Sequence, residues 1–207
     1  MTHRGRLSVL RSILIPVVTI PALTCADTAD DRSGTPPIVK QPALVSIDTH
    51  AVQNATYMSQ FSEAGFVTLT AGVYESDEPE WRVMASLDEH VAIGDLDGND
   101  TAEAAVVIWT NTGGTGAFVD LAVLEERDGQ IVNIATRFLG DRLRIHSLSI
   151  SDRVVELDAT IHTPDDPMCC PSLRVKRRFR MERGSLIEDG RPHGAMDYGS
   201  PNGDVIE

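Results

Sequence analysis

The sequence predicts a mainly β protein: one antiparallel β-sandwich, or one strongly curved sheet, with one or two short helices. Apolar and polar residues alternate along most segments between residues 66 and 187, as they do in strands that bury one face. Short turn sequences such as Asp128-Gly129 and Arg183-Gly184 separate these segments. Residues 51–188 are also enough for a single domain with its own core.

The first expected element is a helix over 49–62, with Val52, Tyr57, Met58 and Phe61 as its apolar residues. Expected strands follow at 66–70, 73–74, 81–87, 90–93, 104–109, 118–124, 130–139, 144–151, 154–162, 173–182 and 185–187. Residues 104–109 are continuously apolar, which is typical of a strand buried on both faces. Turns are expected at Asp128-Gly129, Gly140-Asp141, Ser151-Asp152 and Arg183-Gly184.

Two of these strands, 154–162 and 173–182, share an alternation that predicts an antiparallel pair. A register in which the paired residue numbers sum to 336 sets Leu157 opposite Phe179 and Ile161 opposite Val175. The other face then sets Glu156 against Arg180 and Asp158 against Arg178.

The same pairing bears on the basic residues of 173–182, which are Arg174, Lys176, Arg178 and Arg180. Taken alone, these residues resemble a basic strip that binds a polyanion. Cross-strand pairing with acidic residues, worth roughly 0.2–1 kcal/mol a pair, is the preferred interpretation. Arg177 falls on the apolar face without an evident partner.

The N-terminus predicts an export signal over residues 1–25. Arg4, Arg6 and Arg11 precede an apolar stretch, 13–23, that is shorter than the about 20 apolar residues of a membrane-spanning helix. Cys25 follows directly and resembles the lipidated cysteine of a bacterial lipobox. The alternative is ordinary cleavage near Ala26, which discards Cys25.

Composition suggests how the rest of the chain is organised. Residues 26–50 carry several Asp, Gly and Pro and indicate a flexible linker, and residues 189–207 indicate a disordered tail. Removing residues 1–24 takes away three arginines and no acid, so the formal charge of −13 becomes −16. Such a charge argues against nucleic-acid partners and favours divalent cations.

Oxygen-bearing side chains occupy alternate positions of one short loop: Asp95, Asp97, Asn99, Thr101 and Glu103. Alternate residues of a tight loop can converge on one ion, and calcium takes about 6–8 oxygen ligands. We expect Thr101 to contribute its carbonyl and the other four their side chains. The alternative is a metal-free turn, because Asp and Asn cap turns well.

The nine residues 95–103 resemble the calcium loops of FG-GAP-type repeats, although Asp100 stands where Gly is usual and Glu103 where Asp is usual. The acidic loop, Gly113-Gly114-Thr115-Gly116 and Cys169-Cys170-Pro171-Ser172 together resemble small bacterial envelope lipoproteins of the LppP/LprE type. That resemblance implies an exported domain in the periplasm or cell envelope and implies no catalytic residue. By itself, the glycine-rich segment indicates a hairpin loop, because it lacks the Gly-Lys-Ser/Thr of a phosphate loop.

Cys169 and Cys170 are the remaining cysteine pair once Cys25 is lipidated or removed. A disulfide is expected in an exported protein, yet adjacent Cα atoms lie about 3.8 Å apart, below the usual disulfide range. Two free thiols or a bond to another chain are the alternatives. A zinc site would need a second Cys or His pair.

The function expected from these features is that of a non-enzymatic exported domain that binds a protein or an envelope component. It would touch a membrane only through a lipid on Cys25, and calcium would stabilise its loop. The alternative is a metal-assisted hydrolase that uses Asp95–Glu103. That reading requires an open metal position, a base and a pocket, so a cleft holding His90 or His146 beside the acidic loop would favour it.

Overall fold

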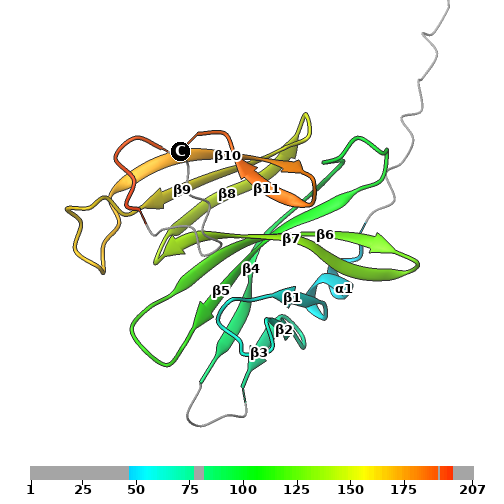
Figure 1. Cartoon of the computed structure of the whole chain (residues 1–207), viewed down its shortest axis with the longest axis horizontal. Helices are drawn as coiled ribbons and strands as arrows, with labels where there is room; N and C mark the ends of the chain where they lie inside the picture. The colour runs from blue at the N-terminus through cyan, green and yellow to red at the C-terminus, as the bar shows by residue number, and fades with distance from the viewer. Residues whose placement is uncertain (1–46, 77–81, 191, 198–207) are drawn as a thin grey trace, which may run out of the picture. The chain divides into compact units, whose positions relative to one another are not determined.

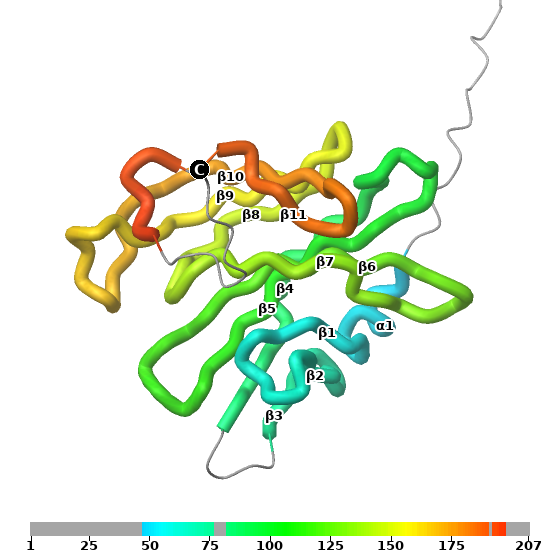
Figure 2. Tube along the Cα trace, viewed as in Figure 1, coloured from blue at the N-terminus to red at the C-terminus, as the bar shows by residue number. Residues whose placement is uncertain are grey.

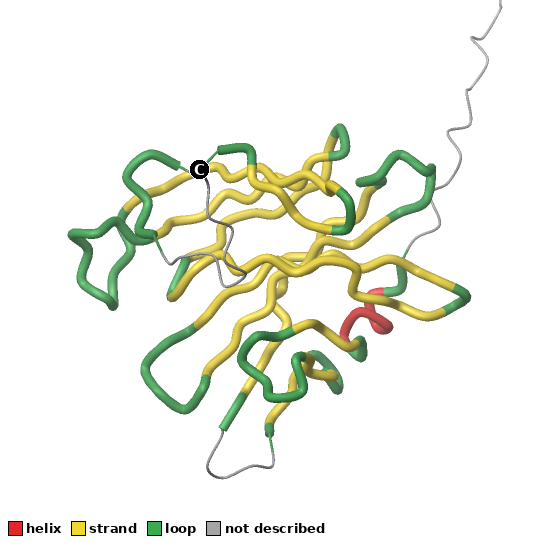
Figure 3. The backbone as a smooth tube through the Cα atoms, viewed as in Figure 1, coloured by secondary structure: helices red, strands yellow, loops and turns green. Residues whose placement is uncertain are grey.

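A computed structural model describes residues 47–76, 82–190 and 192–197. They form one helix and eleven strands, and the mainly β, antiparallel fold is confirmed (Figure 1, Figure 3). None of the described residues forms a helix with the length and apolar character needed to cross a bilayer. The elements are α1 (Thr49–Gln53), β1 (Thr56–Met58), β2 (Phe66–Thr68), β3 (Val73–Glu75), β4 (Met84–Gly94), β5 (Glu103–Asn111), β6 (Phe118–Arg127), β7 (Gln130–Asp141), β8 (Arg144–Ser151), β9 (Val154–Ile161), β10 (Leu173–Glu182) and β11 (Ser185–Glu188).

The strands follow one another as neighbours, which gives a simple topology. The order β3-β4-β5-β6-β7 makes a five-stranded sheet, and β11-β10-β9-β8 makes a four-stranded sheet. The sheets are antiparallel and include a strongly curled half-barrel. Figure 1 shows β8–β11 over one face of the five-stranded sheet and α1 with β1 and β2 on the other face.

The five-stranded sheet carries apolar residues on both faces because both faces are covered. Val107, Leu121 and Val123 pack with Leu157 and Phe179 of the four-stranded sheet in one core cluster. The alternate residues of β5 and β6 pack in a second cluster with residues of α1, β1 and β2. This arrangement explains the continuous apolar run predicted at 104–109, since a strand in the middle layer has no solvent-facing side.

The helix predicted over 49–62 is wrong in its extent. Helix α1 ends at Gln53, and the Asn54 backbone N–H closes it by bonding to the carbonyls of Ala51 and Val52. Residues 56–58 form β1 instead, because their backbone pairs with β2 across a short loop. Tertiary pairing therefore overrides the apolar spacing that favoured a longer helix.

Strands β9 and β10 pair as predicted, but the predicted register is wrong by two residues. Leu157 lies opposite Arg177, and Val155 lies opposite Phe179. A shift of two keeps every side chain on its predicted face, because side chains alternate with a period of two. In the loop between the strands, the Asp166 carboxylate accepts the backbone N–H groups of Thr163 and Ser172.

The folded region reaches beyond both ends of the predicted 51–188 segment. Ile47 is 3% exposed and belongs to the second core cluster, although it lies in the segment expected to be linker. At the other end the Met196 N–H donates to the His162 carbonyl at 2.8 Å, within the segment expected to be a disordered tail. The turn expected at Gly140-Asp141 falls later, because both residues pair with β6 as part of β7. The export signal and Cys25 lie outside the described residues.

Candidate functional site

The acidic loop connects two central strands at one end of the sandwich. Gly94 and Glu103 form the last pair between β4 and β5, and residues 95–102 close the hairpin. Strand β8 approaches β4 closely there, since a Cβ on Gly94 would lie 2.7 Å from Cγ2 of Ile150. Figure 2 shows the green loop between β4 and β5 beside the yellow turn between β8 and β9.

The loop is held by its own acidic side chains. Asp95 Oδ1 accepts the Gly98 N–H at 2.6 Å, and Asp97 Oδ1 accepts the Asn99 N–H at 3.1 Å. Gly98 and Asp100 have φ values of 84° and 64°, a left-handed conformation that Gly, Asn and Asp adopt more readily than other residues. These are the turn hydrogen bonds that the alternative interpretation requires, and the carboxylates hold the loop in this conformation.

Three of the five residues predicted to bind metal come together. One oxygen from each of Asp95, Asp97 and Glu103 lies within 4.8 Å of the others. Calcium binds oxygens at about 2.3–2.6 Å, so two of its ligands can lie about 5 Å apart. The cluster fits one cation of that size, with three carboxylates as a partial ligand set. Glu103 is only 1% exposed and is oriented by the Leu96 N–H, which donates to its Oε2 at 2.7 Å.

The Asn99 side chain and the Thr101 N–H and hydroxyl bond within the loop, and the Thr101 carbonyl stays a predicted ligand. Asn99 Oδ1 accepts the Thr101 N–H at 2.7 Å and the Thr101 hydroxyl at 2.5 Å. The Asn99 amide also donates to Asp97 Oδ2 at 3.0 Å. Both residues thus position the carboxylates, and Asn99 would have to break these bonds to bind an ion directly.

The electrostatics of the cluster favour a cation. Burial raises the pKa of Glu103, and the nearby Asp97 and Asp95 carboxylates raise it further, while the Leu96 N–H lowers it. A positive ion would offset both unfavourable effects.

The positively charged side chain of Arg153 already lies close to the acidic loop, although the sequence analysis did not identify it. A Cβ on Gly98 would lie 2.1 Å from the Cζ atom of Arg153, so the guanidinium lies directly against the loop backbone. Arg153 comes from the turn between β8 and β9 and has a φ of 61°. The sequence signal is Gly98 itself, since any larger residue there would displace the arginine.

A pocket of about 450 Å³ adjoins the acidic cluster. It opens between the two sheets, with Val132 and Ile134 of β7 on one side and Met181 of β10 on the other. Asp97 and Glu103 line it, together with the ion pair of Glu125 and Arg127. The described residues that line it include no histidine.

The two histidines considered for catalysis are engaged elsewhere. The His90 ring bonds to Asp88 at 2.5 Å, and the Trp109 indole N–H donates to the same carboxylate at 2.6 Å. Burial alone would raise the pKa of Asp88, but the hydrogen bonds from His90 and Trp109 lower it below its usual value. His146 bonds to Thr160 at 2.8 Å.

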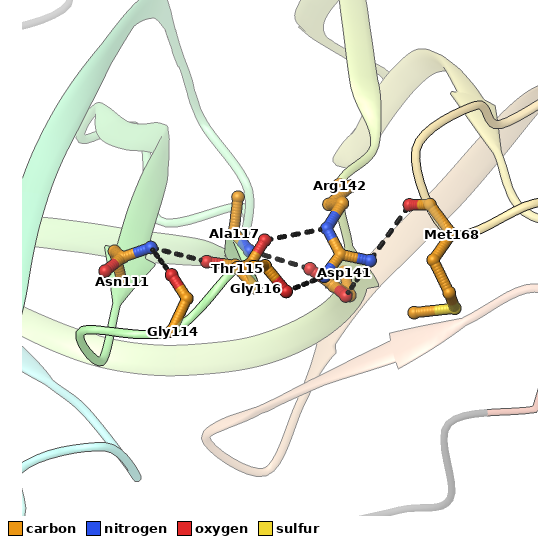
Figure 4. Close-up of polar contacts among 8 residues, drawn as sticks. All are labelled: Asn111, Gly114, Thr115, Gly116, Ala117, Asp141, Arg142 and Met168. Atoms are coloured by element: carbon orange, nitrogen blue, oxygen red, sulfur yellow. Dashed lines mark hydrogen bonds and ion pairs between the residues drawn. The ribbon is translucent and has the colours of Figure 1, made fainter.

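The glycine-rich loop and the cysteine loop are linked by one arginine (Figure 4). Arg142 donates to the Thr115 carbonyl and to the Met168 carbonyl, both at 2.9 Å. It also pairs with Asp141 at 3.1 Å, and Asp141 accepts the Ala117 N–H at 2.7 Å. The segment 113–116 is a loop between β5 and β6, as predicted.

Cys169 and Cys170 are joined by a disulfide, with their Cα atoms 3.8 Å apart. The bond lies within the β9–β10 loop, next to the Met168 carbonyl that Arg142 holds. The adjacent-cysteine pairing considered from the sequence is therefore the arrangement found in this structure.

The basic residues of β10 pair with carboxylates, though with partners other than those expected. Arg174 makes two bonds of 3.0 Å to Asp158, which hold the pKa of Asp158 below its usual range. Arg178 pairs with Glu156 at 3.4 Å, and Arg180 with Asp189 at 2.8 Å.

Arg177, for which the sequence suggested no partner, is 8% exposed and bonds Glu188 of β11 at 2.6 and 2.8 Å. Its guanidinium also lies 5.1 Å from the centroid of the Phe179 ring.

The described site thus combines a three-carboxylate cluster, an adjacent pocket and a loop stabilised by its own hydrogen bonds. The cluster and the loop come from the β4–β5 connection, and the pocket adds residues of β7 and β10, so the whole site forms only in the folded domain. The chain matches no known family model, no curated protein and no solved structure.

Proposed function

We propose that the protein is an exported, non-enzymatic domain of the periplasm or cell envelope whose acidic loop binds calcium. The observation that carries the metal site is the convergence of Asp95, Asp97 and Glu103, with oxygens within 4.8 Å of one another. Calcium would join the β4–β5 loop to the first residue of β5 and so stabilise this end of the sandwich. The chain's own residues supply three ligands and the hydrogen bonds that orient them.

Export rests on the sequence of residues 1–25, and a membrane anchor rests on Cys25 alone. The partner is a protein or an envelope component. Nucleic acid is a poor candidate, since the chain carries a formal charge of −13 and the arginines at 174, 178 and 180 are paired with acidic residues. The pocket beside the cluster, with apolar walls and a charged rim, is the proposed contact region.

A metal-assisted hydrolase is the second candidate, and the adjoining pocket is the observation that favours it. Its lining residues supply carboxylates but, among those described, no histidine to act as a base. The paired states of His90 and His146 support the binding role over hydrolysis.

The deciding experiment is thermal unfolding of the purified protein in chelator, calcium and magnesium. A ligand that binds only the folded state stabilises it by RT ln(1 + [L]/Kd), about 2.7 kcal/mol at a hundredfold excess over Kd. We expect calcium to raise Tm in this way and magnesium to do much less, because magnesium requires strict octahedral geometry.

Two variants make the experiment specific. Asp97→Asn removes one carboxylate charge from the cluster and should abolish the calcium effect. Asp128→Asn, in the β6–β7 turn at a φ of 53° that asparagine tolerates, removes the same charge elsewhere and should retain it. Identical unfolding of the wild type in all three solutions would contradict the calcium site.

A further inference from the structure

A second buried carboxylate lies far from the acidic loop along the sheet. Asp120 is on β6, 5% exposed, and faces the layer formed by α1, β1 and β2. Across residues 47–76, 82–190 and 192–197 its side chain makes no hydrogen bond or ion pair. Buried carboxylates are rarely left without a partner, because removing one from water is costly. Asp120 therefore needs an explanation that the fold alone does not supply.

Asp120 faces a pocket of about 290 Å³ between β6, β7 and the loop that follows β1. Thr136 and Phe138 of β7 line one side, and Met58, Ser59 and Gln60 line the other. The walls are thus mixed: Met58 and Phe138 supply apolar surface, and Ser59, Thr136 and Gln60 supply two hydroxyls and an amide.

An irregularity in the sheet and an aromatic cluster shape this pocket. The pairing of β6 and β7 shifts between Val119 and Asp120, so Asp120 lies opposite Phe138. The Phe138 ring packs against Phe61 and Phe118, whose own rings stack at 4.5 Å. Phe61 thereby holds the loop after β1 over the pocket.

We infer that this pocket binds a small organic cation, a primary alkylammonium, with its N–H groups on the Asp120 carboxylate and its carbon chain against Phe138 and Met58. A carboxylate accepts several N–H bonds, which an ammonium can donate and a neutral alkyl group cannot. An aromatic ring adds attraction for a cation. The volume is at the small end of ligand sites, which suits a chain of a few carbon atoms.

Among the described residues that line the pocket, Asp120 is the only titratable one. Two other acidic residues belong to the elements around the pocket. Glu63 is in the loop after β1, and Asp141, which is paired with Arg142, is in β7. Arg137 of β7 donates to the Leu186 carbonyl of the other sheet and so faces away. No described cation competes for Asp120, so an incoming ammonium would be its counter-ion.

The test is a titration of the protein with n-butylammonium at pH 8, followed by NMR shifts of the amides of Ser59, Gln60 and Phe138. The neutral 1-butanol, of the same size, is the ligand control. We expect the ammonium to shift these amides with at least tenfold higher affinity than the alcohol. Burial raises the pKa of Asp120 to about 7, so its ionised fraction is about 1% at pH 5 and about 90% at pH 8. Affinity should therefore fall by up to about ninetyfold at pH 5, where the amine stays protonated.

Asp120→Asn preserves the shape of the side chain and should remove the preference for the ammonium over the alcohol. Asp128→Asn, in the turn that follows the same strand, should keep it. Equal binding of the two ligands, no binding at all, or ammonium binding that survives in Asp120→Asn would each overturn the inference. Because the acidic loop is not involved, none of these results bears on the calcium site.

Discussion

Replacing Asp120 with asparagine is expected to stabilise the protein above pH 7, although a charged residue becomes neutral and no contact is gained. Asparagine has nearly the shape of a protonated aspartic acid. It therefore reproduces the neutral form that the buried site prefers and cannot ionise. In wild type the carboxyl group must lose its proton inside the fold as the pH rises, and no partner offsets the lost hydration.

The size of the effect follows from the difference in pKa between the two states. Burial raises the folded pKa to about 7, from an ordinary value of 3.8. That is a difference of about three units, or about 4 kcal/mol at 1.36 kcal/mol a unit. Because the folded pKa is the higher one, the unfolded chain ionises first as pH rises. Wild-type stability should therefore fall between about pH 4 and pH 7 and then stay lower by that amount.

The assay is urea unfolding of wild type and Asp120→Asn at half-unit steps from pH 4 to pH 8. The buffers must contain no primary amine, because an amine bound to Asp120 would mask the effect. The difference in unfolding free energy between the two proteins isolates this one group from all others that titrate. A difference that stays constant across the range would refute the account of Asp120 as an unpaired buried acid.

Three further predictions concern the arginines. Arg153→Gln removes the positive charge beside the acidic loop and should raise calcium affinity severalfold by calorimetry; unchanged or weaker binding would mean that Arg153 lies too far from the ion to matter. Arg142→Lys keeps the charge but cannot reach three acceptors, so the Ala117 amide should exchange its hydrogen at least tenfold faster, and wild-type protection would argue against the linking role. Arg177→Met leaves the largely covered Glu188 carboxylate unpaired, at a cost of about 3–5 kcal/mol in urea unfolding. The double change with Glu188→Leu should recover most of that loss, and a double variant as unstable as the single one would count against the buried pair.

Most strands could be predicted from the sequence because alternation reports directly which face is buried. The stretch at 104–109 even indicated a strand covered on both sides, and β5 lies in the middle layer. The register between β9 and β10 could not be predicted for the same reason. A shift of two residues leaves every side chain on the same face, so the pattern alone could not match Leu157 to Arg177.

The candidate site could be predicted only where its residues lie close together in sequence. Asp95, Asp97 and Glu103 belong to one loop, so their spacing was visible. Arg153 and the pocket residues of β7 and β10 come from segments that only the folded chain brings near. The length of the first helix was mispredicted because β2, which pairs with residues 56–58, leaves no mark on their apolar spacing.

The cover over the second face of the five-stranded sheet has a mechanical consequence. Ile47 and α1 are the first described parts of the fold, and both pack in the layer that hides Ala104, Val106 and Leu124. Tension on the chain before Ile47 would enter the domain through this layer, whose strands β1 and β2 have three residues each. The two sheets of longer strands would bear load only after α1, β1 and β2 had detached from the five-stranded sheet. A tethered molecule under strain would thus bare an apolar sheet face while its other core stayed intact.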